Sequence, residues 1–430
     1  MRKFVFSSLF VTALAGCQAN SAGVPTAAAN DVDGAAVAAQ PSAAEAEGVE
    51  AASPVPANFD DWVAAFRQRA RAEGIDPVTL AAAFDDVRYQ PRVIELDRSQ
   101  PEFVRPIWEY LDSAVSATRV DQGRIKLKEH RETARQMAQR YGVPEEIVAA
   151  IWGVESNYGD NFGSFSTIDA LATLGYDGRR PAFAASELMT ALRILQRGDI
   201  SRARMQGSWA GAMGHTQFLP SSFETYAVDG DGDGRRDIWG SIPDVMASTA
   251  NYLAEAGWQS GQPWGVEVVL PNGFDYSQTE LSTRLSSGEW AAQGVRPAGD
   301  DELPAFASAS VIAPAGARGP AFLVGPNYRA ILRYNNATSY ALAVGALADR
   351  IAGRGGIEQT WPRHERPLSR SQVREMQQRL NARGFDTGTP DGVMGPNTRR
   401  GLREFQRSID QIPDGFATQR LLERLESEQS

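Results

Sequence analysis

The sequence predicts a mainly α protein of the α+β class, in which a small β-rich insertion interrupts a helical domain and a second helical unit follows. From about residue 59 to residue 260, apolar residues recur at helical spacing, as Val63 and Phe66 do. Between residues 262 and 325, short apolar runs lie between Gly and Pro turns and predict strands. Helical spacing then returns at 339–351, which predicts that the chain re-enters the helical domain.

The composition narrows the function classes. Of the 430 residues, 42% are hydrophobic, which is ordinary for a chain that buries a core and excludes wholesale disorder. The formal net charge of −10 disfavours a nucleic-acid binder, because such proteins neutralise phosphates with basic surfaces. The single cysteine, Cys17, excludes an internal disulfide framework and a multi-cysteine metal site.

The N-terminus predicts export. Two basic residues precede the apolar run 4–15, which is too short to span a bilayer but suits a signal peptide over residues 1–16. Residues 14–17, Leu-Ala-Gly-Cys, resemble the lipobox of bacterial lipoproteins, which implies that Cys17 carries acyl chains. Gln18 follows, and by resemblance to sorting rules this implies an outer-membrane lipoprotein facing the periplasm. The alternative is an ordinary signal peptide that contains a cysteine.

The segment 17–57 predicts a disordered tether behind this lipidated cysteine. It is rich in Ala, Pro and Ser, and from residue 18 onward it has neither aromatic nor basic residues. It cannot bury enough apolar surface to offset the entropy lost on ordering.

A helix beginning near Pro144 carries the first candidate for catalysis. Pro144 suits the first helical position, and Ile147, Ile151 and Val154 form an apolar stripe on which Glu155 also lies. Burial raises the pKa of a carboxyl group, so Glu155 would suit a general acid. The alternatives are a buried glutamate paired with an arginine and a carboxylate at a helix end.

Four ordered sequence blocks resemble the B-type membrane-bound lytic murein transglycosylases. Residues 153–159, Gly-Val-Glu-Ser-Asn-Tyr-Gly, are similar to the catalytic signature, and 207–222 are similar to the second block. Asn251-Tyr252 and the segment 333–340 match the later blocks, so the resemblance covers about residues 58–360. It implies a lysozyme-like catalytic domain with Glu155 as the only catalytic carboxylate. The sugar cleft would be lined by Ser208, Gln217, Tyr252, Tyr334, Asn335 and Tyr340.

The chemistry implied by the resemblance needs no second acid and no catalytic cofactor. Ordinary glycosidases use two carboxylates, whereas neither signature block supplies a second one beside Glu155. The expected reaction cleaves the β-1,4 bond between N-acetylmuramic acid and N-acetylglucosamine, with the muramic 6-hydroxyl attacking to leave a 1,6-anhydro end. Two alternatives are a lysozyme-type muramidase that uses water and a non-catalytic peptidoglycan-binding lipoprotein.

An acidic loop after the second block resembles the opening of an EF-hand calcium loop. Asp229, Asp231 and Asp233 occupy positions 1, 3 and 5, and Arg235 occupies position 7, which binds through its main chain in such loops. Position 12 is Gly240 instead of Glu, and Asp244 is a candidate late ligand. The loop predicts a structural Ca²⁺ or Na⁺ site, and the alternative is an acidic surface turn that binds no cation.

Residues 366–430 resemble the three-helix peptidoglycan-binding domain found beside cell-wall hydrolases. The resemblance rests on helical spacing at the start of the unit and on the later residues Gly388, Gly395, Thr398 and Phe405-Gln406. The pair Asp391-Gly392 recurs as Asp414-Gly415, which suggests two half-repeats. The alternative is a small helical module of unrelated role.

The expected partners of the protein are peptidoglycan glycan strands, a membrane reached through the lipid, and other cell-wall enzymes. No nucleic acid is expected as a partner. The three histidines, including His215, form no recognisable metal triad.

Overall fold

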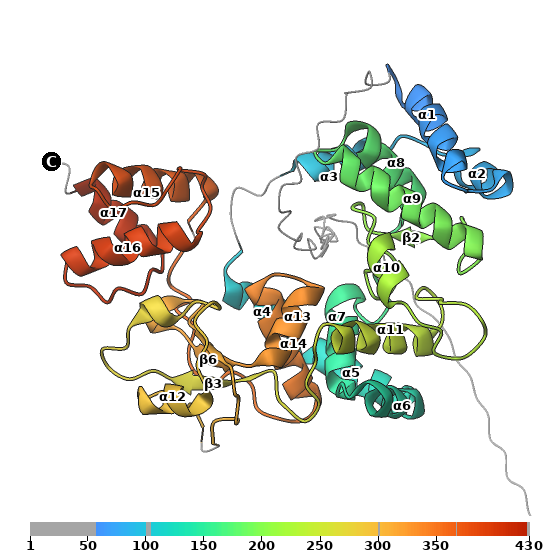
Figure 1. Cartoon of the computed structure of the whole chain (residues 1–430). Coiled ribbons are helices and arrows are strands. Elements are labelled where there is room, and N and C mark those ends of the chain that lie inside the picture. Colours follow the sequence, from blue (N-terminus) through green and yellow to red (C-terminus); the bar gives the residue numbers. More distant parts are fainter. Residues whose placement is uncertain (1–56, 100–104, 300–301, 367, 428–430) are drawn as a thin grey trace, which may run out of the picture. The chain divides into compact units, whose positions relative to one another are not determined.

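Seventeen helices and six short strands follow one another in the described part of the computed structural model, which comprises residues 57–99, 105–299, 302–366 and 368–427 (Figure 1). The predictions for the signal peptide, Cys17 and the tether lie outside these residues, apart from the last residue of the tether. The described residues contain no helix that is both long enough and apolar enough to cross a membrane.

The first half of the chain is helical, as predicted. Its elements are α1 (Phe59–Ala72), α2 (Pro77–Phe84), α3 (Pro91–Arg98), α4 (Ile107–Ala114), α5 (Ala117–Glu129), α6 (Arg131–Tyr141), α7 (Glu145–Ser156), β1 (Phe165–Ser166), α8 (Thr167–Asp177), α9 (Pro181–Arg197), β2 (Gln206–Gly207), α10 (Pro220–Tyr226) and α11 (Ile242–Glu255). Strands β1 and β2 pair antiparallel. A large cluster of buried side chains from these helices, except α3, and from α13 and α14 forms the main core.

The β-rich insertion is also observed. It contains β3 (Gly265–Val269), α12 (Ser287–Ala292), β4 (Arg296–Pro297), β5 (Ser310–Ile312) and β6 (Ala321–Val324), with the 3₁₀ turns η1 (Tyr276–Gln278) and η2 (Gly316–Arg318). The strands form an antiparallel sheet in the order β4-β3-β6-β5, in which Val266 pairs with Leu323. Trp290 and Phe306 belong to a hydrophobic core of this insertion.

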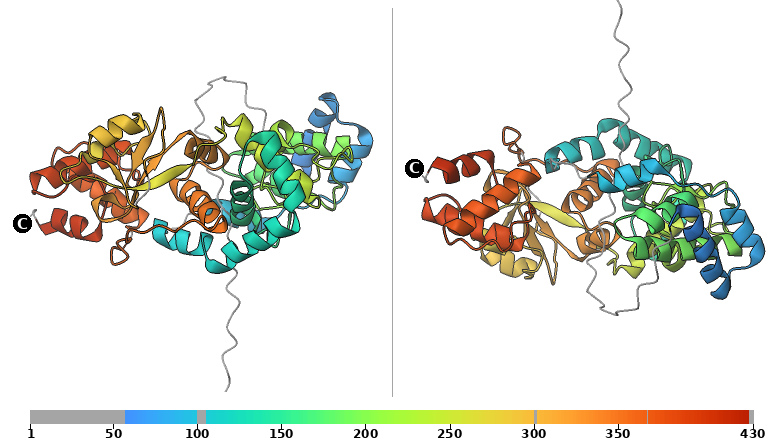
Figure 2. Two further views of the ribbon diagram at one scale, coloured as in Figure 1. Left: turned by 90° about the horizontal axis from the view of Figure 1, so that it is seen from below. Right: turned by 90° about the horizontal axis from the view of Figure 1, so that it is seen from above.

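After the insertion, the chain returns to the main core through α13 (Pro326–Tyr334) and α14 (Thr338–Ile351). The C-terminal unit has its own core and consists of α15 (Arg370–Ala382), α16 (Pro396–Ser408) and α17 (Gln419–Ser427). Figure 2 shows these three helices together from two further sides. The predicted fold class, a mainly helical protein with a small β insertion and three C-terminal helices, is confirmed.

One local prediction is corrected. Pro144 is the N-cap of α7 and not its first helical residue, because its ψ of 140° is extended. Glu145 and Glu146 occupy the first turn, where the helix dipole favours negative charge.

Candidate active site

Glu155 lies near the C-terminal end of α7, a helix whose residues are mostly buried. This helix packs against α5, α11 and α14, and it is buried nearly all round instead of along one stripe. The chain then turns sharply, because Asn157 and Tyr158 both adopt the left-handed conformation, with φ of 50° and 60°. Such a backbone is unfavourable for tyrosine and persists only where packing holds it. Here the Tyr158 hydroxyl donates to the Arg119 carbonyl (2.8 Å), which fixes the turn that follows Glu155.

Glu155 is a buried acid that accepts a hydrogen bond from one side chain, that of Tyr340. The residue is 8% exposed, and the Tyr340 hydroxyl donates to its Oε1 at 2.6 Å. Burial raises the pKa of Glu155 to about 7, and the hydrogen bond from Tyr340 acts in the opposite direction. No described carboxylate contributes to this pKa shift. The group is therefore protonated in a large fraction of molecules at neutral pH without a second acid to hold its proton.

Tyrosines from three helices lie next to this acid. The rings of Tyr334 and Tyr340 are stacked with centroids 6.4 Å apart, and Tyr252 lies 4.6 Å from Tyr334. The Tyr252 hydroxyl donates to the Arg333 carbonyl at 2.6 Å, and the Tyr334 hydroxyl donates to the Thr216 carbonyl at 2.7 Å. Burial and the charge of Glu155 raise the pKa of Tyr340 and of Tyr334 well above their ordinary value, so both remain hydrogen-bond donors.

The other predicted cleft residues are anchored in different ways. Gln217 has a left-handed φ of 51°, and its amide donates to the carbonyls of Phe162 (3.0 Å) and Gly214 (2.9 Å). The Ser208 hydroxyl accepts from the Ala212 amide at 3.1 Å. Asn335 is buried, and its Oδ1 has no hydrogen-bond partner among the described residues. A buried acceptor of this kind is costly unless another molecule satisfies it.

Two residues near Glu155 were not predicted from the sequence. Tyr110, in α4, has its pKa raised to about 12 by burial and by the charge of Glu155. His215 packs against α7: its Nδ1 accepts from the Trp152 indole at 3.1 Å, and its carbonyl accepts from the Ser156 hydroxyl at 2.9 Å. Tyr110 lies in none of the four sequence blocks and His215 lies in the second block without an assigned role, so only the three-dimensional contacts reveal them.

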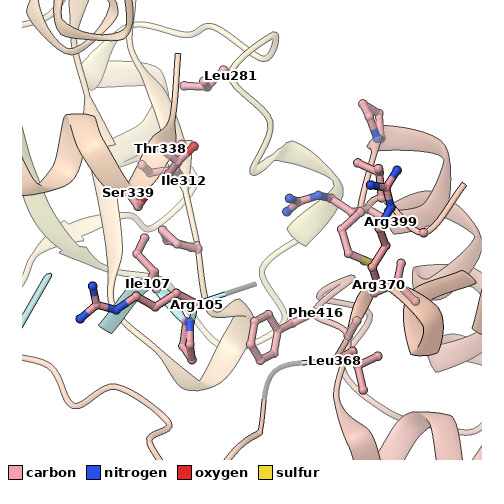
Figure 3. A pocket seen from close by; sticks show the side chains of 18 of the residues that line it. Arg105, Ile107, Leu281, Ile312, Thr338, Ser339, Leu368, Arg370, Arg399 and Phe416 are labelled. Carbon is pink, nitrogen blue, oxygen red and sulfur yellow. The ribbon is translucent and has the colours of Figure 1, made fainter. Parts of the chain in front are cut away.

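A cavity of about 970 Å³ has Ser208 in its wall and extends to the C-terminal helices (Figure 3). Its wall includes arginines, among them Arg105, Arg370 and Arg399, together with apolar side chains such as Phe416. Glu155 does not line it, although Ser339, the residue before Tyr340 in the chain, does.

The acidic loop brings three of the predicted metal ligands together. Carboxylate oxygens of Asp229, Asp231 and Asp244 lie within 4.8 Å of one another. The amides of Gly234 and Gly232 donate to Asp229, and these hydrogen bonds lower its pKa. Asp244 is fully buried and accepts from two main-chain amides, which lie at 2.7 Å and 2.6 Å.

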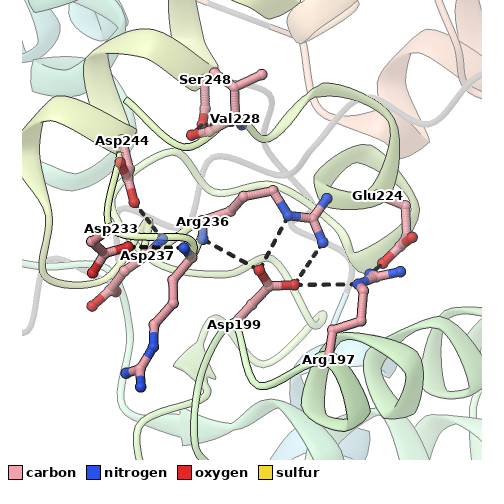
Figure 4. A network of polar contacts seen from close by, with 10 residues as sticks. Arg197, Asp199, Glu224, Val228, Asp233, Arg236, Asp237, Asp244 and Ser248 are labelled. Carbon is pink, nitrogen blue, oxygen red and sulfur yellow. Dashed lines mark hydrogen bonds and ion pairs between the residues drawn. The ribbon is translucent and has the colours of Figure 1, made fainter. Parts of the chain in front are cut away.

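Asp233 is not among the three converging carboxylates, although its amide donates to Asp231 Oδ1 at 3.2 Å. The Asp233 carboxylate accepts from the Arg235 amide at 2.8 Å and is exposed. Next to them, the buried Asp199 accepts from the guanidinium of Arg236 at 2.6 Å and also pairs with Arg197 (Figure 4). This network attaches the end of the loop to the C-terminus of α9 independently of any cation.

A helical domain whose site holds one buried carboxylic acid among tyrosines is what a lysozyme-like enzyme with a single catalytic acid requires. Comparisons with known proteins agree: residues 58–349 match the Transglycosylase SLT domain family, and residues 369–425 match a peptidoglycan binding domain family. The chain belongs to the lytic transglycosylase family of peptidoglycan-cleaving enzymes, as its sequence motifs predict.

Individual relatives support the same assignment. Membrane-bound lytic murein transglycosylase B of Escherichia coli (strain K12) is 34% identical over 250 residues, which are 56% of this chain and 66% of that protein. The crystal structure of SltB3 from Pseudomonas aeruginosa in complex with NAG-anhNAM-pentapeptide has 52% identity and a TM-score of 0.84, and the match covers 86% of this chain and 100% of that one. The Escherichia coli lytic transglycosylase Slt35 in complex with calcium has 30% identity and a TM-score of 0.58, over 68% of this chain and 92% of that one.

Proposed function

We propose that this lytic transglycosylase cleaves the β-1,4 bond between N-acetylmuramic acid and N-acetylglucosamine and leaves a 1,6-anhydro-muramic end, with Glu155 serving first as acid and then as base. The observation that carries this proposal is the state of Glu155, a buried carboxyl group with a pKa of about 7 and no described carboxylate acting on it. A two-carboxylate mechanism needs a partner about 5–10 Å away, and the signature blocks supply none.

The proposed reaction has two proton transfers through one side chain. Protonated Glu155 donates to the glycosidic oxygen as the bond to the muramic C1 breaks, which leaves Glu155 as a carboxylate. The carboxylate then removes the proton from the muramic 6-hydroxyl while that oxygen bonds to C1. The Tyr340 hydroxyl, 2.6 Å from Oε1, stabilises the carboxylate between the two steps.

The buried polar groups of the site give the substrate places to bind. Asn335 Oδ1 is suited to accept from an acetamido N–H of the sugar, since no described residue satisfies it. Ser208 lines the 970 Å³ cavity and would position the same group of a neighbouring sugar. Holding the 6-hydroxyl close to C1 is a proximity effect, which alone can lower a barrier by several kcal/mol, on the order of 7–11 in favourable cases.

Mass spectrometry of sacculi digested by the purified chain tests this function against its alternatives. The proposal predicts soluble muropeptides with anhydro ends. Reducing ends would instead identify a muramidase that uses water. No release at all, from a folded protein, would favour a non-catalytic wall-binding lipoprotein.

We also propose a structural cation at the acidic loop. The fit is supported by three carboxylates that converge within 4.8 Å, because such a cluster repels itself unless a cation or protonation neutralises it. Hard oxygen ligands of this kind suit Ca²⁺, which the related Slt35 structure contains. Asp229, Asp231 and Asp244 would hold the ion, and Asp233 and Arg235 complete the predicted ligand set. Glu155 is not among the converging carboxylates, so the proposed role of the ion is to stabilise the fold.

The N-terminal sequence supports attachment to the outer membrane through lipid on Cys17, with the enzyme in the periplasm. Cys17→Ala removes the sole thiol and is expected to abolish labelling with radioactive palmitate and to release the protein from the membrane fraction. Labelling that persists in this variant would disprove the lipid anchor.

A further inference from the structure

The C-terminal module contains two turns of the same construction. In the first turn, the Gln377 side-chain amide donates to Asp391 Oδ1 (3.0 Å) and Gln377 Oε1 accepts from the Gly392 amide (2.8 Å). The Val393 amide also donates to Asp391 Oδ1 at 2.8 Å. One oxygen of Asp391 thus builds the turn, while no described residue donates to the other oxygen, Oδ2.

The second turn repeats these contacts with Gln406 and Asp414. Gln406 donates to Asp414 Oδ1 (2.6 Å) and accepts from the Gly415 amide (2.8 Å), and the Phe416 amide donates to Asp414 Oδ1 (3.0 Å). The two glycines have similar left-handed φ values of 79° and 69°. The two half-repeats suggested by the sequence are therefore built alike.

In the second turn, the outer oxygen is occupied by a peptide segment of the same chain. Asp414 Oδ2 accepts from the Ala317 amide at 3.0 Å. The preceding residue must be small, because a Cβ at Gly316 would lie 2.4 Å from Asp414 Oδ2 and 2.7 Å from the Phe416 Cβ. Arg403, whose side chain is only 9% exposed, pairs with the Glu280 carboxylate at 3.4 Å. The turn thus holds an amide N–H and a small residue, and an arginine from its own half-repeat holds a carboxylate.

The first turn offers the same groups to solvent. Asp391 is exposed, and Val393, at the position of Phe416, is 51% exposed. Arg374 lies at the helical position that Arg403 takes in the second half-repeat; it is exposed and donates to the Asp391 carbonyl at 3.2 Å. Gly392 and Val393 also line the 970 Å³ cavity.

We infer that the Asp391-Gly392 turn binds the stem peptide of peptidoglycan in the way that the Asp414-Gly415 turn binds the chain's own Gly316–Ala317 segment. Asp391 Oδ2 accepts a peptide N–H that follows a residue without an L-configured Cβ, because Gly316 takes that place in the second turn with a left-handed φ of 64°, which a D-alanine adopts readily. Arg374 pairs with a free carboxylate of the peptide. Stem peptides supply all three features, whereas a sugar acetamido group supplies only an N–H and a methyl group. The inference rests on the proposed function only in taking peptidoglycan as the ligand.

Asp391→Asn tests this site with almost no change of shape. The amide oxygen can keep the contacts to Gln377 and the Val393 amide, while an NH₂ group replaces the acceptor at Oδ2. Binding is measured in the full chain carrying Glu155→Gln, so that the ligand is not consumed. The probes are intact sacculi, sacculi stripped of peptides by an amidase, and a soluble stem pentapeptide. Asp410→Asn, an exposed position of the same module with left-handed φ, is the matched control.

We expect Asp391→Asn and Arg374→Gln each to weaken binding to intact sacculi and to the pentapeptide by about fivefold to fiftyfold, the effect of losing one hydrogen-bonded or charged partner. The control should bind like the parent, all variants should keep its thermal midpoint, and peptide-stripped sacculi should not distinguish them. Equal binding by parent and Asp391→Asn overturns the inference, and so does a difference that persists on stripped sacculi, which would assign the turn to sugar. Muropeptide release by chains that retain Glu155 is measured separately, so failure of this site is distinguishable from failure of the proposed activity.

Discussion

Two carboxyl groups in different regions of this protein, Glu155 and Asp229, are held in opposite ways. Glu155 is buried in the active site, accepts a hydrogen bond from one tyrosine, and has its pKa raised to about 7. Asp229 in the acidic loop accepts from the main-chain amides of Gly232 and Gly234, and these hydrogen bonds lower its pKa.

The difference shows that the surroundings of a carboxyl group decide whether it acts as a proton donor or as an anion. Removal from water favours the neutral acid, which can donate a proton, whereas amide donors favour the anion, which can bind a cation. The positions are set by secondary structure: Glu155 is carried on a buried helix, and the aspartates alternate with glycines in a loop.

The largest expected effect is the loss of peptidoglycan cleavage when the buried acid Glu155 is replaced. Glu155→Gln removes the proton donor but keeps the shape, so peptidoglycan cleavage should fall by about 10²- to 10⁴-fold. Glu187→Gln is the matched control, because Glu187 is also buried but accepts from the Ser221 amide and hydroxyl, away from the site. It should lower stability and leave cleavage near the parent rate. Muropeptide release and circular dichroism measure both properties, and a folded Glu155→Gln chain that remains active would refute the assignment.

The pH dependence of stability follows from the same burial. Because the folded-state pKa of Glu155 is raised above its unfolded value, the folded chain binds more protons between about pH 4.5 and pH 7. The contribution of Glu155 to stability is therefore fully present below that window and is lost as the pH rises through it. Thermal midpoints of Glu155→Gln relative to the parent should thus increase across this range. A difference that does not change with pH would mean that Glu155 is not held protonated.

A smaller effect is expected when cation binding to the loop is removed. Ca²⁺ at a hundred times its Kd should stabilise the parent by about 2.7 kcal/mol and raise its thermal midpoint by several degrees. Asp231→Ala should abolish that response, while Asp86→Ala, an exposed acid away from the cluster, should keep it. A parent midpoint that is the same in Ca²⁺ and in chelator would exclude the cation site.

The smallest expected effect is a shift of the pKa of Glu155 when its hydrogen-bond donor, Tyr340, is replaced. The Tyr340 hydrogen bond lowers the pKa of Glu155, so Tyr340→Phe should raise that pKa further and move the alkaline limb of kcat/KM to higher pH. Tyr328→Phe is the control, since the Tyr328 hydroxyl donates to the Thr338 carbonyl at 3.3 Å. An alkaline limb that moves to lower pH in Tyr340→Phe would contradict the described hydrogen bond.

Much of the fold could be predicted from the sequence, because the spacing of apolar residues along the chain indicates which face of a helix or strand is buried. The pattern of apolar residues predicted α7, α14 and the strands β3 and β6, but it did not predict that these two strands pair. Sequence blocks indicated Glu155 and Tyr340, although they are 185 residues apart and meet only in the folded chain.

Other features depend on contacts that no local pattern encodes. Tyr110 comes from a helix upstream of the four family blocks, and its relation to Glu155 arises from the packing of α4. The two C-terminal turns look alike in sequence, yet only the second is occupied by Ala317, because the insertion supplies that segment. Occupancy of this kind is a property of the tertiary structure.

The most direct test of the account is titration of Glu155 itself. Carbon-13 NMR of the glutamate side-chain carboxyl groups, with Glu155→Gln identifying the signal, gives its pKa in the folded chain. Burial in the lysozyme-like site predicts a midpoint near pH 7. A midpoint near the ordinary glutamate value, about 4.3, would show that Glu155 is ionised at neutral pH and would contradict its role as the single acid of the reaction.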